Sequence, residues 1–156
     1  MTGIIETRIS DLGIALPEVA APVANYVPYT ITNNLVYVSG QIPFVDGKIK
    51  YPGKLGQNVS ISDGEKAARL CGLNILAQLK SACNGDLDRV NQAIKLCGFV
   101  NGTNDFTDQA LVINGASDLM FEVFQDKGKH SRVAVSCIAL PLGAAVEVDA
   151  IFEISL

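Results

Sequence analysis

Residues 146–154 constrain the fold of this chain more than any other segment, because apolar and charged side chains alternate along them. The apolar members fall on one face of an extended chain: Val146, Val148, Ala150, Phe152 and Ile154. Glu147, Asp149 and Glu153 fall on the other face. Successive side chains of a strand point to opposite sides of its sheet, so this pattern is typical of a strand with one buried face.

A second apolar segment, residues 131–140, precedes that strand, and Leu140-Pro141-Leu142-Gly143 lies between the two. A tight turn at these residues would join the two strands as a hairpin. Arg132 would then open the first strand, immediately before the apolar run Val133-Ala134-Val135. An arginine beside buried apolar surface, with its rigid fork of donors, suits a planar carboxylate.

The remaining chain predicts an α+β fold in a single domain over residues 1–156, with an N-terminal extension at 1–20. Helices are expected at 3–13, from Ser62 or Asp63 to Cys83, and at 107–127. Strands are expected at 26–32, 35–39 and 90–100, with turns at Asn33-Asn34 and Asp46-Gly47 and a loop at 50–60. The order β-β-β-α-β-α-β-β favours a sandwich in which the two long helices pack on one face of the sheet.

Composition limits the possible partners of the chain. Hydrophobic residues make up 49% and charged residues 18%, yet no apolar run approaches the ~18 residues of a membrane span. We therefore expect other subunits to cover the surplus apolar surface, with an unusually apolar monomer as the alternative. A net charge of −4 with scattered basic residues argues against a general nucleic-acid surface, although weak local contact with RNA stays open. The first residues lack a signal-peptide pattern, so we expect a cytoplasmic protein.

Cysteine and histidine are too sparse and too dispersed to predict a metal site. The four cysteines are Cys71, Cys83, Cys97 and Cys137, with no Cys-x-x-Cys pair, and His130 is the one histidine. A zinc site needs closely spaced ligands of these two types. We expect the cysteines to be small core residues, with Cys83 the most exposed. His130 is expected to be an ordinary loop histidine, and its nearness to Arg132 makes it a secondary candidate for tuning a site there.

Four ordered segments resemble the YjgF/RidA family, also called reactive intermediate deaminases or L-PSP endoribonuclease-like proteins. They are Val38-Ser-Gly-Gln-Ile-Pro43, Asn104-Asp-Phe with Val112-Ile-Asn114, Ser131-Arg-Val-Ala-Val135, and Leu140-Pro141 with Val146-Glu-Val148. The resemblance covers about residues 20–156. It implies a chorismate-mutase-like fold assembled as a homotrimer, with active clefts between subunits.

The resemblance also implies a reaction, the hydrolysis of enamines or imines such as 2-aminoacrylate to 2-keto acids and ammonia, without a cofactor or a metal. By this resemblance Arg132 would bind the carboxylate of a small substrate, and Glu147 would position or activate water. Tyr26, Ser39, Gly40 and Asn114 correspond to the remaining cleft residues.

The chain departs from the family pattern in two ways. Ala134 stands where many members have a cysteine, and the N-terminal helix and the loop at residues 52–60 are longer than in a typical short member. These departures indicate a divergent subgroup and leave its substrate open.

Each candidate residue also has a structural interpretation. Arg132 could form an interface salt bridge and Glu147 could be a solvated strand carboxylate. Tyr26 could be an interface aromatic, Ser39-Gly40 could simply end a strand, and Asn114 could be an ordinary polar helix residue. The alternatives to a deaminase are a module that binds a small carboxylate without catalysis, and an endoribonuclease.

The expected hairpin would place Glu147 opposite Ser136 or Cys137. Glu147 would then lie four or five residues from Arg132, roughly 15 Å at ~3.3 Å per residue. We therefore expect a site shared by both residues to take them from different subunits.

Overall fold

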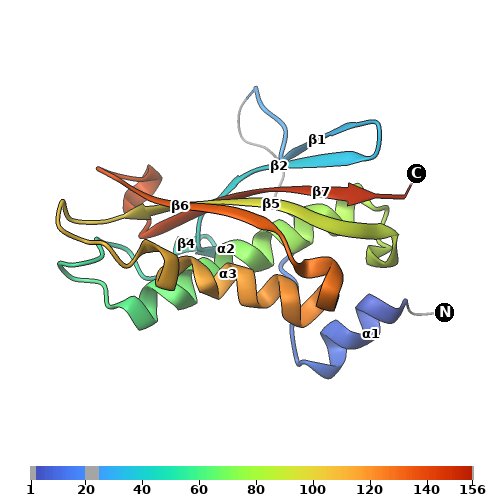
Figure 1. Cartoon of the computed structure of the whole chain (residues 1–156), viewed down its shortest axis with the longest axis horizontal. Coiled ribbons are helices and arrows are strands. Elements are labelled where there is room, and N and C mark those ends of the chain that lie inside the picture. Colours follow the sequence, from blue (N-terminus) through green and yellow to red (C-terminus); the bar gives the residue numbers. More distant parts are fainter. Residues whose placement is uncertain (1–2, 20–24, 156) are drawn as a thin grey trace.

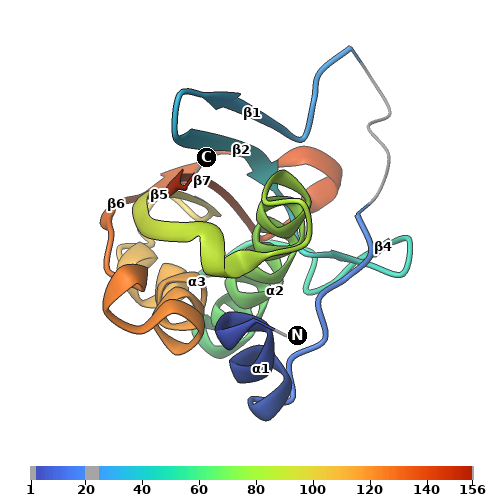
Figure 2. The same ribbon diagram turned by 90° about the vertical axis from the view of Figure 1, so that its right-hand side faces the viewer.

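The computed structural model describes residues 3–19 and 25–155. Its main sheet contains β1 (Tyr29–Thr32), β2 (Leu35–Gln41), β5 (Val90–Asn101), β6 (Ser131–Cys137) and β7 (Val146–Ile154). A small hairpin contains β3 (Phe44–Val45) and β4 (Lys48–Ile49). The helices are α1 (Ile4–Asp11), α2 (Ile61–Ala82) and α3 (Gln109–Phe124), with short 3-10 turns η1 (Leu87–Arg89), η2 (Gln125–Gly128) and η3 (Pro141–Gly143). Figures 1 and 2 show α2 and α3 side by side on one face of the sheet.

Most of the predicted elements are confirmed, and their boundaries follow from local chemistry. Asn33 and Asp46 adopt φ values of 51° and 50°, which the turns expected there require. The helix α2 is capped by Ser60 and not by Ser62 or Asp63, because the Ser60 side chain accepts a hydrogen bond from the Asp63 amide. The first strand begins only at Tyr29, so Tyr26 lies in the segment before it. None of the helices in the described part of the chain is long and apolar enough to cross a membrane.

The expected C-terminal hairpin is wrong, because β5 lies between β6 and β7 in a sheet ordered β1-β2-β7-β5-β6. The strand β6 pairs with β5 in parallel, and every other neighbouring pair in this sheet is antiparallel. Parallel pairing needs a crossover, which α3 supplies between β5 and β6. The chain between β6 and β7 therefore crosses the end of β5 instead of making a tight turn.

Asn101, at the end of β5, holds that crossing segment. Its backbone nitrogen donates to the Ala145 carbonyl at 2.9 Å, and its side-chain Nδ2 donates to the Ala144 carbonyl at 3.2 Å. The Oδ1 atom accepts from Nζ of Lys54 at 2.6 Å, and that ammonium also donates to the Ile138 carbonyl at 2.7 Å. A buried asparagine and a loop lysine thus satisfy backbone groups that a hairpin would have paired.

The alternation along β7 separates a covered face of the sheet from an open one. Val146, Val148, Ala150, Phe152 and Ile154 are all buried against the helix layer, as predicted. Close contact between α2 and α3 needs small residues: a methyl group on Gly115 of α3 would overlap the backbone carbonyl of Glu65 in α2. On the open face, Tyr37, Val133 and Val135 each expose about two fifths of their surface, at 41%, 40% and 42%.

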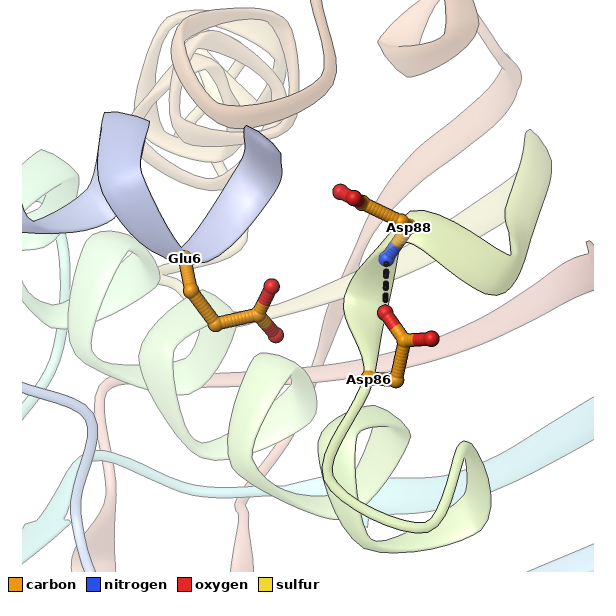
Figure 3. A group of neighbouring side chains, drawn as sticks. All are labelled: Glu6, Asp86 and Asp88. Carbon is orange, nitrogen blue, oxygen red and sulfur yellow. Dashed lines mark hydrogen bonds between the residues drawn. The ribbon is translucent and has the colours of Figure 1, made fainter. Parts of the chain in front are cut away.

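Carboxylates of α1 and of the segment before β5 fasten these two parts of the chain to each other. Asp88 accepts hydrogen bonds from the amides of Ile4 and Ile5, both at 2.8 Å, and Glu6 accepts one from the amide of Leu87 at 2.9 Å. Figure 3 shows Glu6 reaching from α1 toward Asp86 and Asp88. The amides of Ile5 and Ile4 hold the pKa of Asp88 below its usual value. Asp88 therefore caps α1, whose Ile5 and Ile9 are buried while Ile4 and Leu12 are exposed.

Candidate functional site

Arg132 lies on the helix-covered side of the sheet edge. It pairs with Leu96, a buried residue of β5, and its side chain reaches α3. Its Nη1 donates to Oδ1 of Asn114 at 2.8 Å and to Oγ of Ser117 at 3.1 Å. Asn114 and Ser117 are three residues apart and so share one face of the helix. In residues 3–19 and 25–155, no carboxylate lies within 4 Å of the Arg132 guanidinium.

A cavity of about 320 Å³ adjoins Arg132. It is lined by Ser117, Phe121, Gly128, Lys129, His130 and Arg132. Oγ of Ser117 lies 2.9 Å from Nε2 of His130, whose Nδ1 lies 2.7 Å from the Gly128 carbonyl oxygen. The cavity wall therefore carries basic, hydroxyl and aromatic groups and no acidic one. A small anion bound here would meet an arginine already oriented by two side chains of α3.

The second group of candidate residues lies where β2 pairs with β7. Val38 pairs with Ala150 and Gln41 with Val148, so β2 has one extra residue at Ser39-Gly40. This irregularity is a β-bulge. The Glu147 carboxylate occupies the space beside Gly40, where even a methyl group would overlap it. Any side chain at Gly40 would displace the Glu147 carboxylate, which lies against the backbone here.

Ser39 and Tyr26 belong to this second group through the backbone of β2. The Ser39 hydroxyl donates to the Val27 carbonyl at 2.8 Å, and the Ser39 amide donates to the Pro28 carbonyl at 2.9 Å. Both bonds hold the segment that contains Tyr26 against β2. Tyr26 exposes 58% of its surface, so its ring is available to a ligand or to another subunit.

Glu147 is half-buried on the open face of the sheet. Burial and, secondarily, the nearby charge of Asp149 raise the pKa of the Glu147 carboxyl above its usual value of 4.5. A carboxylate in these surroundings holds and releases a proton more readily near neutral pH than a solvated one.

The structure keeps Arg132 and Glu147 apart. Glu147 pairs with Phe99 of β5 and not with Ser136 or Cys137, whereas Arg132 pairs with Leu96. The two residues are thus two strands and three positions apart, roughly 14 Å at the usual strand spacings. Phe99 and Leu96 face opposite sides of β5, so the two side chains also leave opposite faces of the sheet. One chain cannot bring both to one small substrate.

Two contributors to these groups were not predicted from the sequence. Ser117 binds both Arg132 and His130, and its three-residue spacing from Asn114 was the available signal. Asn74 of α2 donates through Nδ2 to the carbonyls of Ile42 at 2.9 Å and Phe44 at 3.2 Å. It thereby fixes the segment that follows Gly40, and no pattern distinguished it from a surface residue of the helix.

The cysteines do not assemble into a site in the described residues. Cys83, expected to be the most exposed, is fully buried, and burial raises the pKa of its thiol to about 11. Cys71 is also buried and donates to the Val146 carbonyl. Glu6, Asp86 and Asp88 form the one acidic group close enough to hold a cation within residues 3–19 and 25–155. An oxygen of each already accepts a backbone amide, so these carboxylates are helix caps.

Comparison with known proteins connects this geometry to a family. The profile of the family described as "YjgF/chorismate mutase-like, putative endoribonuclease" matches residues 6–154. That span covers every candidate residue in both groups.

Solved structures of similar proteins share the fold. The protein Atu1372 of Agrobacterium tumefaciens, whose function is unknown, is 51% identical, with a TM-score of 0.90 over 97% of this chain and 92% of its own. A "putative endoribonuclease" of Shewanella oneidensis MR-1 is 39% identical, with a TM-score of 0.91 over 96% and 99%. Escherichia coli TdcF with bound serine is 25% identical, with a TM-score of 0.60 over 89% and 93%.

Proposed function

Because this chain belongs to the YjgF/RidA family, we propose that it hydrolyses small carboxylate-bearing imines and enamines, such as 2-aminoacrylate, to 2-keto acids and ammonia. The observation that carries the proposal is Arg132, whose guanidinium is oriented by Asn114 and Ser117 and faces no carboxylate within the described chain. A rigid guanidinium with unused donors beside a cavity fits a carboxylate ligand.

In this mechanism Arg132 holds the substrate carboxylate through a bidentate pair, which fixes the position of the adjacent imine carbon. Asn114 and Ser117 occupy Nη1, so Nη2 and Nε are the donors that remain for the ligand. Binding in a fixed orientation supplies much of the rate enhancement, since the protonated imine is already electrophilic.

Glu147 acts as the general base and then as the acid. Water attacks the imine carbon and gives a proton to the Glu147 carboxylate. The substrate thereby becomes a carbinolamine. Glu147 returns that proton to nitrogen, the C–N bond breaks with release of ammonia, and the remaining hydroxyl loses its proton to give the keto acid. The raised pKa of Glu147 favours both transfers. The backbone at Gly40, adjacent to this carboxylate, would contact the amine nitrogen.

The separation of Arg132 from Glu147 supports a site between subunits. We propose a homotrimer in which Arg132 and Asn114 of one subunit meet Tyr26, Ser39, Gly40 and Glu147 of the next. The apolar side chains on the open sheet face support such an assembly, because a monomer would leave them in water.

A binding module that senses a small carboxylate is the second candidate. It is favoured by Ala134, which pairs with Gly98 and leaves no thiol beside Arg132, and by the serine bound to TdcF, an amino acid with a carboxylate. An endoribonuclease has less support, since the charge is −4 and one histidine is present.

A coupled assay separates these candidates. A pyridoxal-dependent dehydratase or an amino-acid oxidase generates the imine in place, and keto-acid formation is followed with wild type and Arg132→Ala. Acceleration by wild type alone is the expected result. Binding of the keto acid without acceleration for several imino acids would instead favour the binding module.

A further inference from the structure

We infer that His130 makes carboxylate binding at Arg132 depend on pH, acting through Ser117 as a positioning residue. The inference rests on the proposed role of Arg132 as the carboxylate ligand. It concerns the hydrogen-bonded series Arg132–Ser117–His130–Gly128, in which the proposed mechanism gives no role to His130 or Gly128.

The hydrogen bonds of this series have a defined direction. The Gly128 carbonyl can only accept, so Nδ1 of His130 carries a proton and donates across 2.7 Å. In a neutral imidazole Nε2 is then the acceptor, and the Ser117 hydroxyl donates to it across 2.9 Å. The oxygen of that hydroxyl accepts from Nη1 of Arg132 at 3.1 Å. Neutral His130 therefore keeps the Ser117 proton turned away from Arg132.

Protonation of His130 reverses one step of this series. Nε2 then becomes a donor and Ser117 must accept from it, which frees the serine proton to turn elsewhere. A second positive charge also appears one serine away from the guanidinium. Both changes favour an anion bound at Arg132, so its affinity should be higher when His130 is protonated.

Within the described chain, the one unpaired charge facing the imidazole is that of Arg132, which a bound carboxylate would offset. From α3 it faces Ser117 and Phe121, both uncharged, and from β6 it faces Arg132. Lys129, on the same segment as His130, pairs with Asp126 at 2.7 Å. From β5 the neutral side chain of Gln92 donates to the Lys129 carbonyl. Lys127 points away, to the Val90 carbonyl at 3.0 Å.

The test uses pyruvate as the probe and calorimetry in two buffers of different ionisation enthalpy. Wild type should bind pyruvate at least about threefold more tightly at pH 6 than at pH 8, which is the effect of an imidazolium and a carboxylate about 7 Å apart even at the dielectric constant of bulk water. Binding should also take up a fraction of a proton, because ligand and proton affinity are linked reciprocally. Pyruvate and arginine do not titrate in this range.

His130→Gln is the matched variant, since its amide oxygen can accept from Ser117 but does not titrate. It should bind pyruvate with the same affinity at pH 6 and pH 8 and without proton uptake. Glu147→Gln should keep the pH effect, which excludes Glu147 as its source. If His130 were only a structural support, His130→Gln would weaken binding equally at both pH values and the dependence on pH would persist.

The outcomes separate this inference from the proposed function. Arg132-dependent binding that is equally tight at both pH values overturns the coupling and leaves the carboxylate site intact. Absence of pyruvate binding at either pH overturns both. Because His130 is the one histidine, its ¹⁵N signals also report the tautomer without a ligand. A signal with the proton on Nε2 at pH 8 would contradict the inferred hydrogen-bond direction.

Discussion

At the scale of single residues, the two proposed catalytic side chains lie in opposite surroundings. Arg132 is exposed and held by neutral partners on α3, whereas Glu147 is half-buried beside the backbone of Gly40. The arginine is thus prepared to receive a negative charge, and the glutamate to exchange a proton. These two roles can be changed separately by mutation.

Replacing Arg132 by lysine should weaken carboxylate binding far more than a conservative change of charge suggests. Lysine keeps the charge but loses the fork of donors and the simultaneous contact with Asn114 and Ser117. Keto-acid affinity measured by calorimetry should fall by at least about tenfold, the usual effect of losing a charged hydrogen bond. Sedimentation of the variant supplies the control. Dissociation of the assembly would indicate that Arg132 is an interface residue instead.

Turnover should decrease at low pH because Glu147 becomes protonated. The base must be ionised, and because burial raises the pKa of this carboxyl, activity should begin to fall at a higher pH than the 4.5 of an ordinary glutamate. Glu147→Gln should keep keto-acid affinity and lose turnover by roughly 10²-fold or more. The comparison is made at saturating imine. Unchanged turnover in this variant would remove Glu147 from the mechanism.

The glycine in the bulge keeps space for the Glu147 carboxylate. Gly40→Ala would place a methyl group against the Glu147 carboxylate and displace it from the backbone. Turnover should fall toward that of Glu147→Gln, while Arg132-dependent binding remains. Gly47→Ala is a control, since a methyl group there meets open space, although its φ of 76° adds some strain. Equal losses in both variants would point to a general effect on folding.

At the scale of elements, the sequence predicts what each segment forms better than where it pairs. The alternation along β7 depends on local burial, so its type and its buried face are correct, and α2 and α3 form as helices where they were expected. The pairing of β6 with β5 depends on α3, which returns the chain parallel to β5. It also depends on Asn101 at the end of β5, whose side chain binds the Gly53 and Ala144 carbonyls. The Leu140–Gly143 segment does not indicate that β5 lies between the two strands it connects, β6 and β7.

For the candidate site, too, the sequence predicts which residues take part better than how they are arranged. The resemblance selected six residues, and the structure places them in two groups: Arg132 with Asn114, and Glu147 with Tyr26, Ser39 and Gly40. The separation of Arg132 from Glu147 was expected, but from a hairpin that does not form. Their placement on opposite faces was not predicted, because it depends on the strand order and on the register. Ser117 and Asn74 were missed because their roles are hydrogen bonds between elements distant in sequence.

The anchoring of α1 gives a stability prediction at this scale. Asp88→Ala removes the acceptor for the Ile4 and Ile5 amides and should loosen α1, by about 1 kcal/mol as for other helix caps. The pKa of Asp88 is lowered in the folded chain, so its contribution is present above the unfolded value, near 3.8, and disappears as pH falls through the folded value. Hydrogen exchange of α1 amides at pH 7 measures the effect. Unchanged protection there would show that burial of Ile5 and Ile9 alone holds the helix.

At the scale of the whole molecule, one chain contains both halves of the proposed site but cannot join them. Arg132 and Glu147 project from opposite sheet faces and lie at registers three residues apart. A closed ring of identical subunits solves this problem, since each interface can pair the Arg132 group of one copy with the Glu147 group of the next. The open face of the sheet, with Tyr37, Val133 and Val135 partly exposed, offers apolar surface for it.

The most direct test of this account mixes two inactive variants, Arg132→Ala and Glu147→Gln, by unfolding and refolding them together. In a random trimer, about one interface in four receives an intact arginine from one copy and an intact glutamate from the other. The coupled assay should then recover roughly a quarter of wild-type turnover, while each variant refolded alone stays inactive. Absence of recovery in verified mixed assemblies would contradict a site shared between subunits.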